Sequence, residues 1–476
     1  MLNKDFHTVL EQEVFQTLAR CADNLSLEAY LVGGFVRDHL LGRGKAKDID
    51  IVAVGSGIEL AKAVQKELPG AQAVQIFKSY GTAMVNWRDI SLEFVGARKE
   101  SYSRDSRNPK VSEGTLEDDQ NRRDFTINAL AVSLNAKDKG TLIDPFNGLE
   151  DLQNGVIKTP LEPGLTYSDD PLRMLRAIRF AAQLSFKIEP QSLKAIQENT
   201  HRISIISNER IIEELHKIML TPKPSVGFLM LDQVGLMERI LPELIQLKGI
   251  EEIEGQRHKD NFYHTLEVVD NICLHTVNLW LRWAALLHDI GKGPTKKFHP
   301  KIGWTFHGHE FVGSKMVYKL FKRLKMPLNE KMKYVQKLVM MSSRPIIIAE
   351  DIVTDAAVRR LVFDAGEILE DLITLCEADI TTKNPARFKR YHNNFKIVRE
   401  KIKEVEERDR IRNFQPPVTG EMIMNHFNLR PCREIGLIKE AIKEAILEGE
   451  IPNEYEAAFA FMIKKGSEIG LEAHGE

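Results

Sequence analysis

The chain has 476 residues, about three times the ~150 residues of a typical domain, so a single small binding module is excluded. Hydrophobic residues make up 43% and charged residues 28% of the chain, a composition that excludes a disordered or fibrous protein. The formal net charge is −2, so any nucleic-acid partner must be bound by a local basic surface.

The cysteines and the N-terminus predict a cytoplasmic protein that does not span a membrane. The four cysteines lie far apart, form no Cys-x-x-Cys pair and suggest reduced thiols. The N-terminal segment MLNKDFHTVLEQEVFQ is polar, without the apolar core of a signal peptide, and no run approaches the ~18 apolar residues of a membrane span.

The first ~160 residues alternate between two patterns. Short β-branched segments bounded by Gly, Asn or charge predict strands, whereas residues 57–68 have helical apolar spacing. The expected strands are residues 29–34, 48–57, 82–87, 90–97 and 128–135. After Pro163 the segments have a 3.6-residue period, so we expect the remainder to be helical, with the charged helix 398–412 as a solvated face.

Asp48 and Asp50 lie in the strand-like segment Asp-Ile-Asp-Ile. The two-residue period of a strand places both carboxylates on one face and Ile49 and Ile51 on the other. Two neighbouring carboxylates repel each other, and a divalent cation that prefers oxygen ligands, such as Mg²⁺ or Mn²⁺, relieves the repulsion. A solvated strand edge is the alternative for this short pattern taken alone.

Gly33 and Gly34 follow a strand-like run and open a short helix that ends near Gly42. Bare backbone N–H groups at a helix N-terminus bind phosphate readily. The pair therefore predicts a phosphate cradle beside the acidic pair, and a tight strand-to-helix turn is the alternative, because glycine serves that purpose as well.

Further motifs follow these two in a recognisable order. The sequences are GGFVRD with DIDI, then RRDFTINA, IDPFNG and DDPLRMLRAIRF, at residues 33–38, 48–51, 122–129, 143–148 and 169–180. Together they resemble the polymerase-β-like nucleotidyltransferases, specifically the class II tRNA nucleotidyltransferase and bacterial poly(A) polymerase group. The resemblance continues along nearly the whole chain.

The resemblance implies roles for the matching residues. Asp48 and Asp50 would bind two Mg²⁺ ions, which activate the 3′-hydroxyl of an RNA primer and hold the triphosphate. The residues implied to bind the nucleotide are Gly33, Gly34, Arg37, Arg122, Arg123, Asp124, Asn128, Asp170, Arg173, Arg176 and Arg179. Without the family, the Arg-Arg-Asp turn would be interpreted as a surface ion pair.

Glu93 is a candidate third carboxylate at the metals. It shares a strand face with Ser91 and Val95, and polymerase folds often bring a third acid to this position. A partly buried Glu93 paired with Arg98 is the alternative interpretation.

Asp170 and Arg173 are three residues apart at the start of a helix opened by Pro171, so they share a helix face. A carboxylate acceptor and a forked donor can hydrogen-bond the Watson–Crick edge of cytosine or adenine, so these side chains would act as the template. An N-cap with a helix salt bridge is the alternative. The family motif usually begins with Glu, where this chain has Asp169.

Residues 98–121 have no apolar face and are expected to form a loop of unusual length. The sequences ARKESY and GTLEDDQ resemble the flexible loop of CCA-adding enzymes more than the matching part of poly(A) polymerases. A disordered surface insertion is the alternative.

A histidine-rich region resembles a second family, the HD-superfamily metal phosphohydrolases. It contains an ordered pattern of His, His-Asp and Asp, and the ligands implied for a divalent metal of unknown identity are His264, His288, Asp289 and Asp379. His307 and His309 could serve a second metal or a substrate phosphate. Family members with this insert have phosphatase or 2′,3′-cyclic phosphodiesterase activity toward RNA ends, so the resemblance implies such an activity here.

The whole resemblance predicts an α+β palm with a mixed sheet, followed by helical domains. The expected domains are a nucleotidyltransferase palm over 1–160, a neck that binds RNA and nucleobase over 161–255, an HD domain over 256–395 and a tail over 396–476. The expected reaction adds CCA to tRNA from CTP and ATP; poly(A) polymerase, a partial C- or A-adding enzyme, and an HD hydrolase with an inactive palm are the alternatives. The basic segment 383–390 and the arginines of 173–179 are candidate RNA contacts, although a solvated helix also explains the former.

Overall fold

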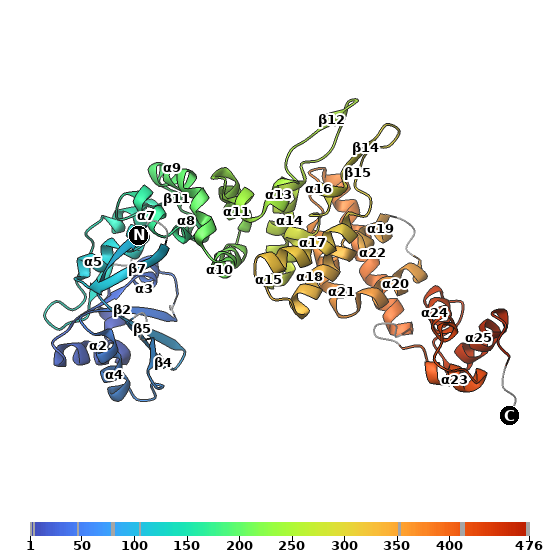
Figure 1. Cartoon of the computed structure of the whole chain (residues 1–476), viewed down its shortest axis with the longest axis horizontal. Coiled ribbons are helices and arrows are strands. Elements are labelled where there is room, and N and C mark those ends of the chain that lie inside the picture. Colours follow the sequence, from blue (N-terminus) through green and yellow to red (C-terminus); the bar gives the residue numbers. More distant parts are fainter. Residues whose placement is uncertain are drawn as a thin grey trace. The chain divides into compact units, whose positions relative to one another are not determined.

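The computed structural model describes residues 2, 5–44, 47–77, 81–103, 106–350, 354–409 and 415–472. The chain forms two compact units, Met1–Pro242 and Glu243–Glu476. The first holds a large sheet, and the second is almost wholly helical (Figure 1). Among the described residues, no helix combines the length and apolar character that a membrane span needs.

A seven-stranded sheet organises the first unit, in the order β3-β4-β5-β2-β1-β8-β9. Strands β2 and β5 are parallel and the other neighbouring pairs are antiparallel, so the sheet is mixed, as predicted. The strands are β1 (Glu28–Val32), β2 (Asp48–Val54), β3 (Gln75–Phe77), β4 (Thr82–Trp87), β5 (Ile90–Gly96), β8 (Ala131–Ser133) and β9 (Leu142–Ile143).

Short helices fill the connections of this sheet. They are α1 (His7–Leu10), α2 (Glu13–Asn24), α3 (Gly34–Leu40), α4 (Gly57–Glu67), α5 (Leu116–Asn121) and α6 (Gly148–Asn154). The Ser56 hydroxyl caps α4 by accepting from the Glu59 backbone N–H, and the apolar face of α4 packs against the sheet and α2. This packing buries the isoleucine side of β2, so the aspartates are left on the other side.

The prediction of a long loop over residues 98–121 is wrong. Strand β6 (Arg98–Ser103) pairs antiparallel with β7 (Ser106–Glu113), outside the main sheet, and α5 follows. A capping box between Thr115 and Asp118 starts α5. The two strands are held by the backbone hydrogen bonds between them and carry no apolar face, which is why the hydrophobic pattern did not reveal them. Arg104 and Asp105, part of the same prediction, lie outside the described residues.

Helices complete the first unit: α7 (Pro163–Asp169), α8 (Leu172–Leu184), α9 (Pro190–Asn199), α10 (Asn208–Met219), α11 (Pro224–Gln233) and α12 (Leu236–Ile240), with α13 (Pro242–Ile245) at the boundary. Helix α8 packs against α10 and α11. A two-residue strand, β11 (Lys187–Ile188), is an exception to the helices predicted after Pro163, and it pairs in parallel with β10 (Val156–Ile157).

The second unit is helical apart from two small hairpins, β12–β13 (Glu252–Ile253 with Gln256–Arg257) and β14–β15 (Lys297–His299 with Gly303–Thr305). Its helices are α14 (Asn261–Cys273), α15 (Leu279–Leu287), α16 (Lys292–Thr295), α17 (His309–Arg323), α18 (Glu330–Met341), α19 (Arg344–Glu350), α20 (Asp355–Ala365), α21 (Leu369–Ala378), α22 (Pro385–Asp409), α23 (Gly420–Phe427), α24 (Arg433–Glu448) and α25 (Tyr455–Glu468).

Helix α22 differs from the prediction of a solvated charged face. Val398, Ile402 and Val405 are buried on one side, spaced four and three residues apart, and the helix packs against α19, α20 and α21. The helix therefore has a narrow apolar stripe, which the many charged residues between its members make hard to recognise in the sequence. Residues 410–412 of the predicted helix lie outside the described residues.

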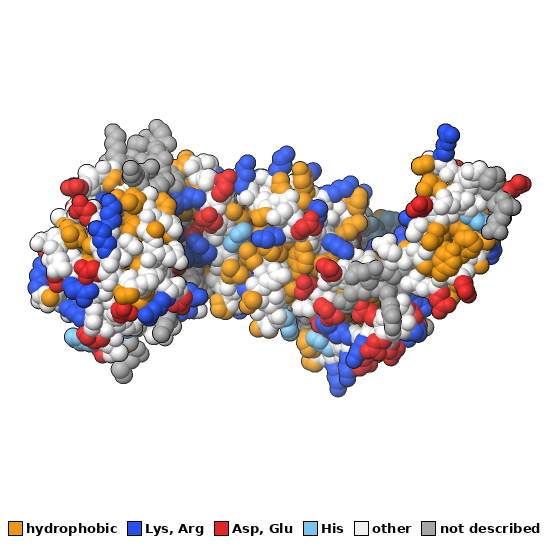
Figure 2. Space-filling view, turned by 90° about the horizontal axis from the view of Figure 1, so that it is seen from below, with side chains coloured by type: hydrophobic (Ala, Val, Ile, Leu, Met, Phe, Trp, Pro, Cys, Tyr) orange, Lys and Arg blue, Asp and Glu red, His pale blue; other side chains and the backbone are white. Residues whose placement is uncertain are grey.

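Basic and acidic side chains are interspersed on the face that Figure 2 presents, in keeping with the small net charge of the chain. Contact with a polyanion must therefore depend on small local sets of cations.

Candidate active sites

The acidic pair lies on the strand face that sequence periodicity predicts. Ile49 and Ile51 are buried, whereas Asp48 is exposed and Asp50 half-buried on the opposite face of β2. In the parallel register with β5, Asp50 is opposite Glu93 and Asp48 is opposite Ser91. Three carboxylates are thus brought to one pair of neighbouring strands.

Burial and neighbouring acids disfavour the ionised forms of Asp50 and Glu93. Burial raises the pKa of Asp50, Arg123 opposes that shift, and the charge of Asp48 adds to it. Burial also raises the pKa of Glu93, with further contributions from Asp50 and Asp48. Arg98, the alternative partner of Glu93, pairs with Glu100 at 2.8 Å. Crowded oxygen donors of this kind fit a hard divalent cation.

The glycine turn lies directly against this acidic face. Gly33 has φ +71°, a conformation that L side chains rarely adopt, and precedes α3. A Cβ at Gly33 would lie 2.9 Å from Asp50 Oδ2 and 3.3 Å from Arg123 Nη1. The structure therefore joins the predicted phosphate cradle, the acidic pair and one arginine of the Arg-Arg-Asp motif.

A continuous polar chain extends from the glycine turn to α8. The buried Arg37 donates from Nη1 to Asn128 Oδ1 at 2.8 Å, and Asn128 Nδ2 donates to Asp124 Oδ1 at 3.0 Å. Arg176 Nε donates to Asp124 Oδ2 at 2.7 Å. Burial alone would raise the pKa of Asp124, but Arg176 and Asn128 outweigh it and lower the pKa to about 2. Residues from three motifs are thus held in fixed positions.

Asp119 is a site residue that sequence reasoning missed. It is fully buried in α5, where it accepts hydrogen bonds from Arg122 and, at 3.0 Å, from Arg123 Nε. Arg122 also contacts Glu100 of β6 at 3.4 Å. An acid three and four residues before two arginines is a helical ion-pair signal, and the expectation of a loop hid it.

The proposed base-reading residues lie at the start of α8. Arg173 Nη2 donates to the backbone oxygen of Arg122 at 2.6 Å, which connects α8 to the Arg-Arg-Asp motif. Asp170 Oδ1 accepts from the Leu172 backbone N–H at 3.2 Å, as the capping interpretation requires. Asp169 ends α7, and burial raises its pKa. Asp170 and Arg173 are both half-buried, so a capping contact and base reading are compatible at this position.

Arg179 contacts a different partner from the other predicted arginines. Its Nε lies 2.7 Å from Glu214 Oε2 of α10, and Glu214 is buried. The ring of Phe180 is contacted by the guanidinium groups of Arg37, Arg176 and Arg179, at 4.9, 5.4 and 3.8 Å from its centroid. A nucleotide-binding role for Arg179 stays a prediction, because its immediate contacts anchor α8 to α10.

The second site is a histidine–aspartate cluster in the helical unit. His264 of α14, His288 at the end of α15 and Asp379 at the end of α21 each offer a ligand atom, all within 4.8 Å of one another. His264 Nε2 lies 2.6 Å from Asp379 Oδ1. Three residues that span 115 positions of the sequence thus converge, as the HD resemblance implies.

Asp289 lies beside this cluster. Its Oδ2 is 3.4 Å from His288 Nε2 and 2.7 Å from Lys292 Nζ, and its Oδ1 is 3.5 Å from His309 Nε2. His307 is exposed and lies two residues before the start of α17. The structure therefore brings His309 toward the predicted ligands and leaves His307 at the surface.

The donor set fits a divalent metal. His288 Nδ1 lies 2.8 Å from the Ala285 carbonyl oxygen, to which it can donate, whereas buried Nε2 has no hydrogen-bond partner. An imidazole fixed in this way presents Nε2 as a ligand. Burial alone would raise the pKa of Asp379, but the adjacent imidazoles of His264 and His288 outweigh it and hold the pKa well below its usual value. A metal binds the ionised carboxylate and the neutral imidazole, so it must displace the proton of His288, whose pKa Asp289 and Asp379 raise to about 10 against the effect of burial.

Family models match most of both units. The Poly A polymerase head domain matches residues 29–158, the probable RNA and SrmB-binding site of polymerase A matches 185–247, and the HD domain matches 261–384. An A-adding tRNA nucleotidyltransferase of Deinococcus radiodurans is 31% identical, over 90% of this chain and 94% of its own length. The chain belongs to the tRNA nucleotidyltransferase and poly(A) polymerase family, with an HD domain.

Two further comparisons agree with this assignment. A multifunctional CCA protein of Nitrosospira multiformis is 35% identical, over 63% of this chain and 70% of its own length. The solved structure of the Thermotoga maritima CCA-adding enzyme complexed with tRNA has a TM-score of 0.61 at 22% identity and covers 97% of each chain, which shows the same fold.

Gly33→Ala should weaken Mg²⁺–ATP binding at least about tenfold, because the new methyl group displaces Asp50 and Arg123 and strains the turn. Isothermal titration calorimetry measures the loss. Gly70→Ala is the matched control, since Gly70 also has a positive φ, +80°, but has nothing within 4 Å of an added Cβ. Equal ATP affinity in the two variants would contradict the placement of Gly33 at the site.

Proposed function

We propose that this protein adds nucleotides to the 3′ end of tRNA, with AMP from ATP as the terminal addition. The supporting observation is the contact between the glycine turn and the acidic strand face, where a Cβ at Gly33 would meet Asp50 and Arg123. Acids that bind metal and a turn that binds phosphate are useful together when a nucleoside triphosphate is the substrate.

The reaction joins the 3′-hydroxyl oxygen of the RNA to the α-phosphorus of the nucleotide and releases pyrophosphate. Asp48 and Asp50 would hold Mg²⁺, with Glu93 beside them, and the bound ions supply charge neutralisation and activation of the hydroxyl. The Gly33 turn and Arg123 orient the triphosphate. Arg37, Asn128 and Asp124 form the polar chain that fixes this region before the substrate arrives.

The identity of the nucleotide is the finer part of the proposal. AMP addition is the activity named for the Deinococcus relative, which aligns along 90% of this chain. Full CCA addition from CTP and ATP is the second candidate, favoured by the multifunctional CCA relative. In both, Asp170 and Arg173 would read the base as acceptor and donor, because one helix end holds them together.

Incubation with tRNA ending in CC should give incorporation of one AMP from ATP, resolved by electrophoresis of labelled tRNA. For tRNA that lacks the whole triplet, addition of CCA from CTP and ATP together would establish the CCA-adding candidate. If this tRNA gives no product, the activity is A addition only. A long ladder with ATP alone would contradict both and indicate poly(A) polymerase. Incorporation should fall steeply as salt rises, because contacts to the RNA backbone are electrostatic.

We further propose that the HD cluster hydrolyses phosphate esters at RNA ends, as a phosphatase or 2′,3′-cyclic phosphodiesterase. His264, His288 and Asp379 would hold the divalent metal, which when bound lowers the pKa of water for attack. Asp289 lies next to His288, and its contact with Lys292 fixes its position. Cleavage of a cyclic phosphate at its P–O3′ bond, or removal of a 3′-phosphate, would leave the free 3′-hydroxyl that nucleotidyl transfer requires.

The two activities should separate by mutation, because their residues lie in different units. Asp48→Ala with Asp50→Ala should abolish incorporation and spare hydrolysis of a tRNA ending in a cyclic phosphate, whereas His288→Ala should do the reverse. Incorporation by the double variant would contradict the palm proposal, and equal hydrolysis by wild type and His288→Ala would contradict the HD proposal. Hydrolysis without incorporation by the wild type would favour the hydrolase with an inactive palm.

A further inference from the structure

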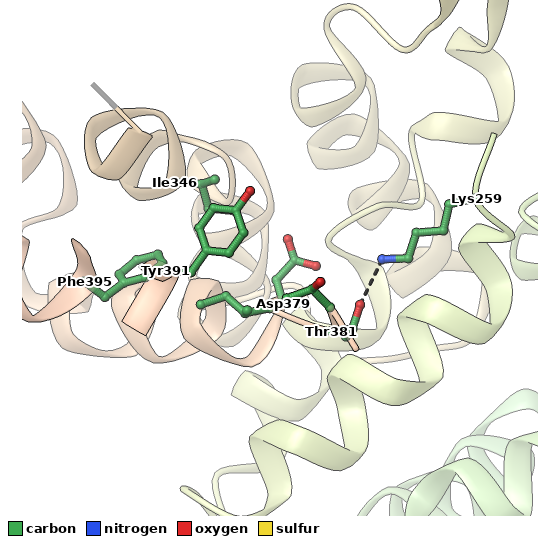
Figure 3. A pocket seen from close by; sticks show the side chains of 8 residues that line it. Lys259, Ile346, Asp379, Thr381, Tyr391 and Phe395 are labelled. Carbon is green, nitrogen blue, oxygen red and sulfur yellow. Dashed lines mark hydrogen bonds between the residues drawn. The ribbon is translucent and has the colours of Figure 1, made fainter. Parts of the chain in front are cut away.

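A cavity of about 380 Å³ lies against the HD cluster. Asp379 forms part of its wall, and Lys259, Thr381 and Tyr391 contribute polar groups, whereas Ile346 and Phe395 are apolar. In Figure 3, Lys259 lies to one side of Asp379, and Tyr391 and Phe395 lie to the other. A ligand that fills the cavity therefore reaches the cluster with one end and an apolar, aromatic wall with the other.

Lys259 places a positive charge between the cavity and the cluster. Its Nζ lies 2.9 Å from Thr381 Oγ1 and 2.5 Å from His264 Nδ1. Among the described residues that line the cavity, it is the one cation. An ammonium with three donors beside a predicted metal site suits an anionic phosphate group, and the phosphate would lie next to Asp379.

Tyr391 supplies an aromatic surface at the opposite wall. It lies in the first turns of α22, is half-buried, and has the guanidinium of Arg390 5.3 Å from its ring centroid. Nucleic-acid bases stack on such rings regardless of sequence, and the apolar side chains of Ile346 and Phe395 extend the wall. The cavity thus offers a phosphate end and a base end.

A set of exposed cations precedes Tyr391 along the chain. Lys383, Arg387, Lys389 and Arg390 are all exposed, and none forms an ion pair with another described residue. Cations without acidic partners are available for backbone phosphates of a polyanion. A single nucleotide would have no use for four of them, so their position favours a longer RNA.

We propose that this cavity binds the phosphorylated 3′ end of a single-stranded RNA. Lys259 contacts the terminal phosphate, Tyr391 stacks on the last base, and the basic segment 383–390 holds the preceding backbone. The inference rests on the hydrolase proposed above and names its substrate class and binding residues.

The test uses the full-length protein carrying Asp48→Ala and Asp50→Ala, with EDTA in place of metal and no nucleotide, so that the proposed hydrolase cannot remove the terminal phosphate during the measurement. The probes are two fluorescent RNA hexamers that differ only in a 3′-phosphate or a 3′-hydroxyl, and fluorescence anisotropy gives Kd. We expect tighter binding of the phosphate end by about tenfold. Lys259→Met should abolish this preference, and Tyr391→Leu should weaken binding of the phosphate end by about tenfold. Arg387→Ala with Arg390→Ala should weaken both hexamers equally.

Lys396→Met is the matched control, because Lys396 is an exposed lysine of α22 outside the basic segment. It should leave both Kd values unchanged. Metal content by mass spectrometry and thermal unfolding show whether Lys259→Met keeps the cluster and the fold, and Lys259→Arg should restore part of the preference if the charge is what matters.

The inference would be overturned if Lys259→Met and Tyr391→Leu both kept the wild-type Kd values and the wild-type preference for the 3′-phosphate hexamer over the 3′-hydroxyl hexamer. Competition by adenosine 3′-monophosphate at the same concentration as the hexamer would overturn the RNA part and indicate a small nucleotide ligand. Binding is measured without turnover, so it can be scored separately from hydrolysis. If the protein prefers the 3′-phosphate hexamer but hydrolyses neither a 3′-phosphate nor a cyclic phosphate, the proposed hydrolase is disproved and the proposed binding site is retained.

Discussion

The first unit depends on the close approach of a backbone turn to a charged strand face. Gly33 has no side chain, so the turn can lie against Asp50 without displacing it. Burial raises the pKa of Asp50 and of Glu93, the charge of Asp48 adds to both shifts, and Arg123 opposes the shift of Asp50. The arrangement costs free energy in the absence of a cation and becomes favourable with one, which is the balance expected of a site that must bind a metal together with a triphosphate.

The arginines around this face are held in place by buried acids. Asp119 fixes Arg122 and Arg123, Asp124 fixes Arg176, and Glu214 fixes Arg179. A buried arginine without a partner would be strongly unfavourable, so each acid both compensates the charge and restricts the rotamer. The result is a preorganised set of donors in which little side-chain entropy remains to be lost when a nucleotide binds.

The helical unit also gathers charged and ionisable groups at one place, but with a different mixture of side chains. Its cluster mixes imidazoles with carboxylates, and backbone or hydroxyl contacts set the orientation of each ring. Imidazole and carboxylate together suit transition metals as well as Mg²⁺, whereas the palm offers oxygen alone. One chain thus carries two chemically distinct sets of candidate metal ligands, one in each of its compact units.

The sequence alone determined the strand that carries Asp48 and Asp50, the face that they share and the order of motifs, because these follow from local periodicity and from residue identity. It also indicated the HD ligands through their resemblance to a family. It could not show the hairpin over 98–113, since these strands carry no apolar face, or the contacts of Asp119 and Lys259. Only the tertiary structure brought Gly33 against Asp50 and joined His264 to Asp379 across 115 residues, because such contacts arise from the packing of whole elements and not from neighbours along the chain.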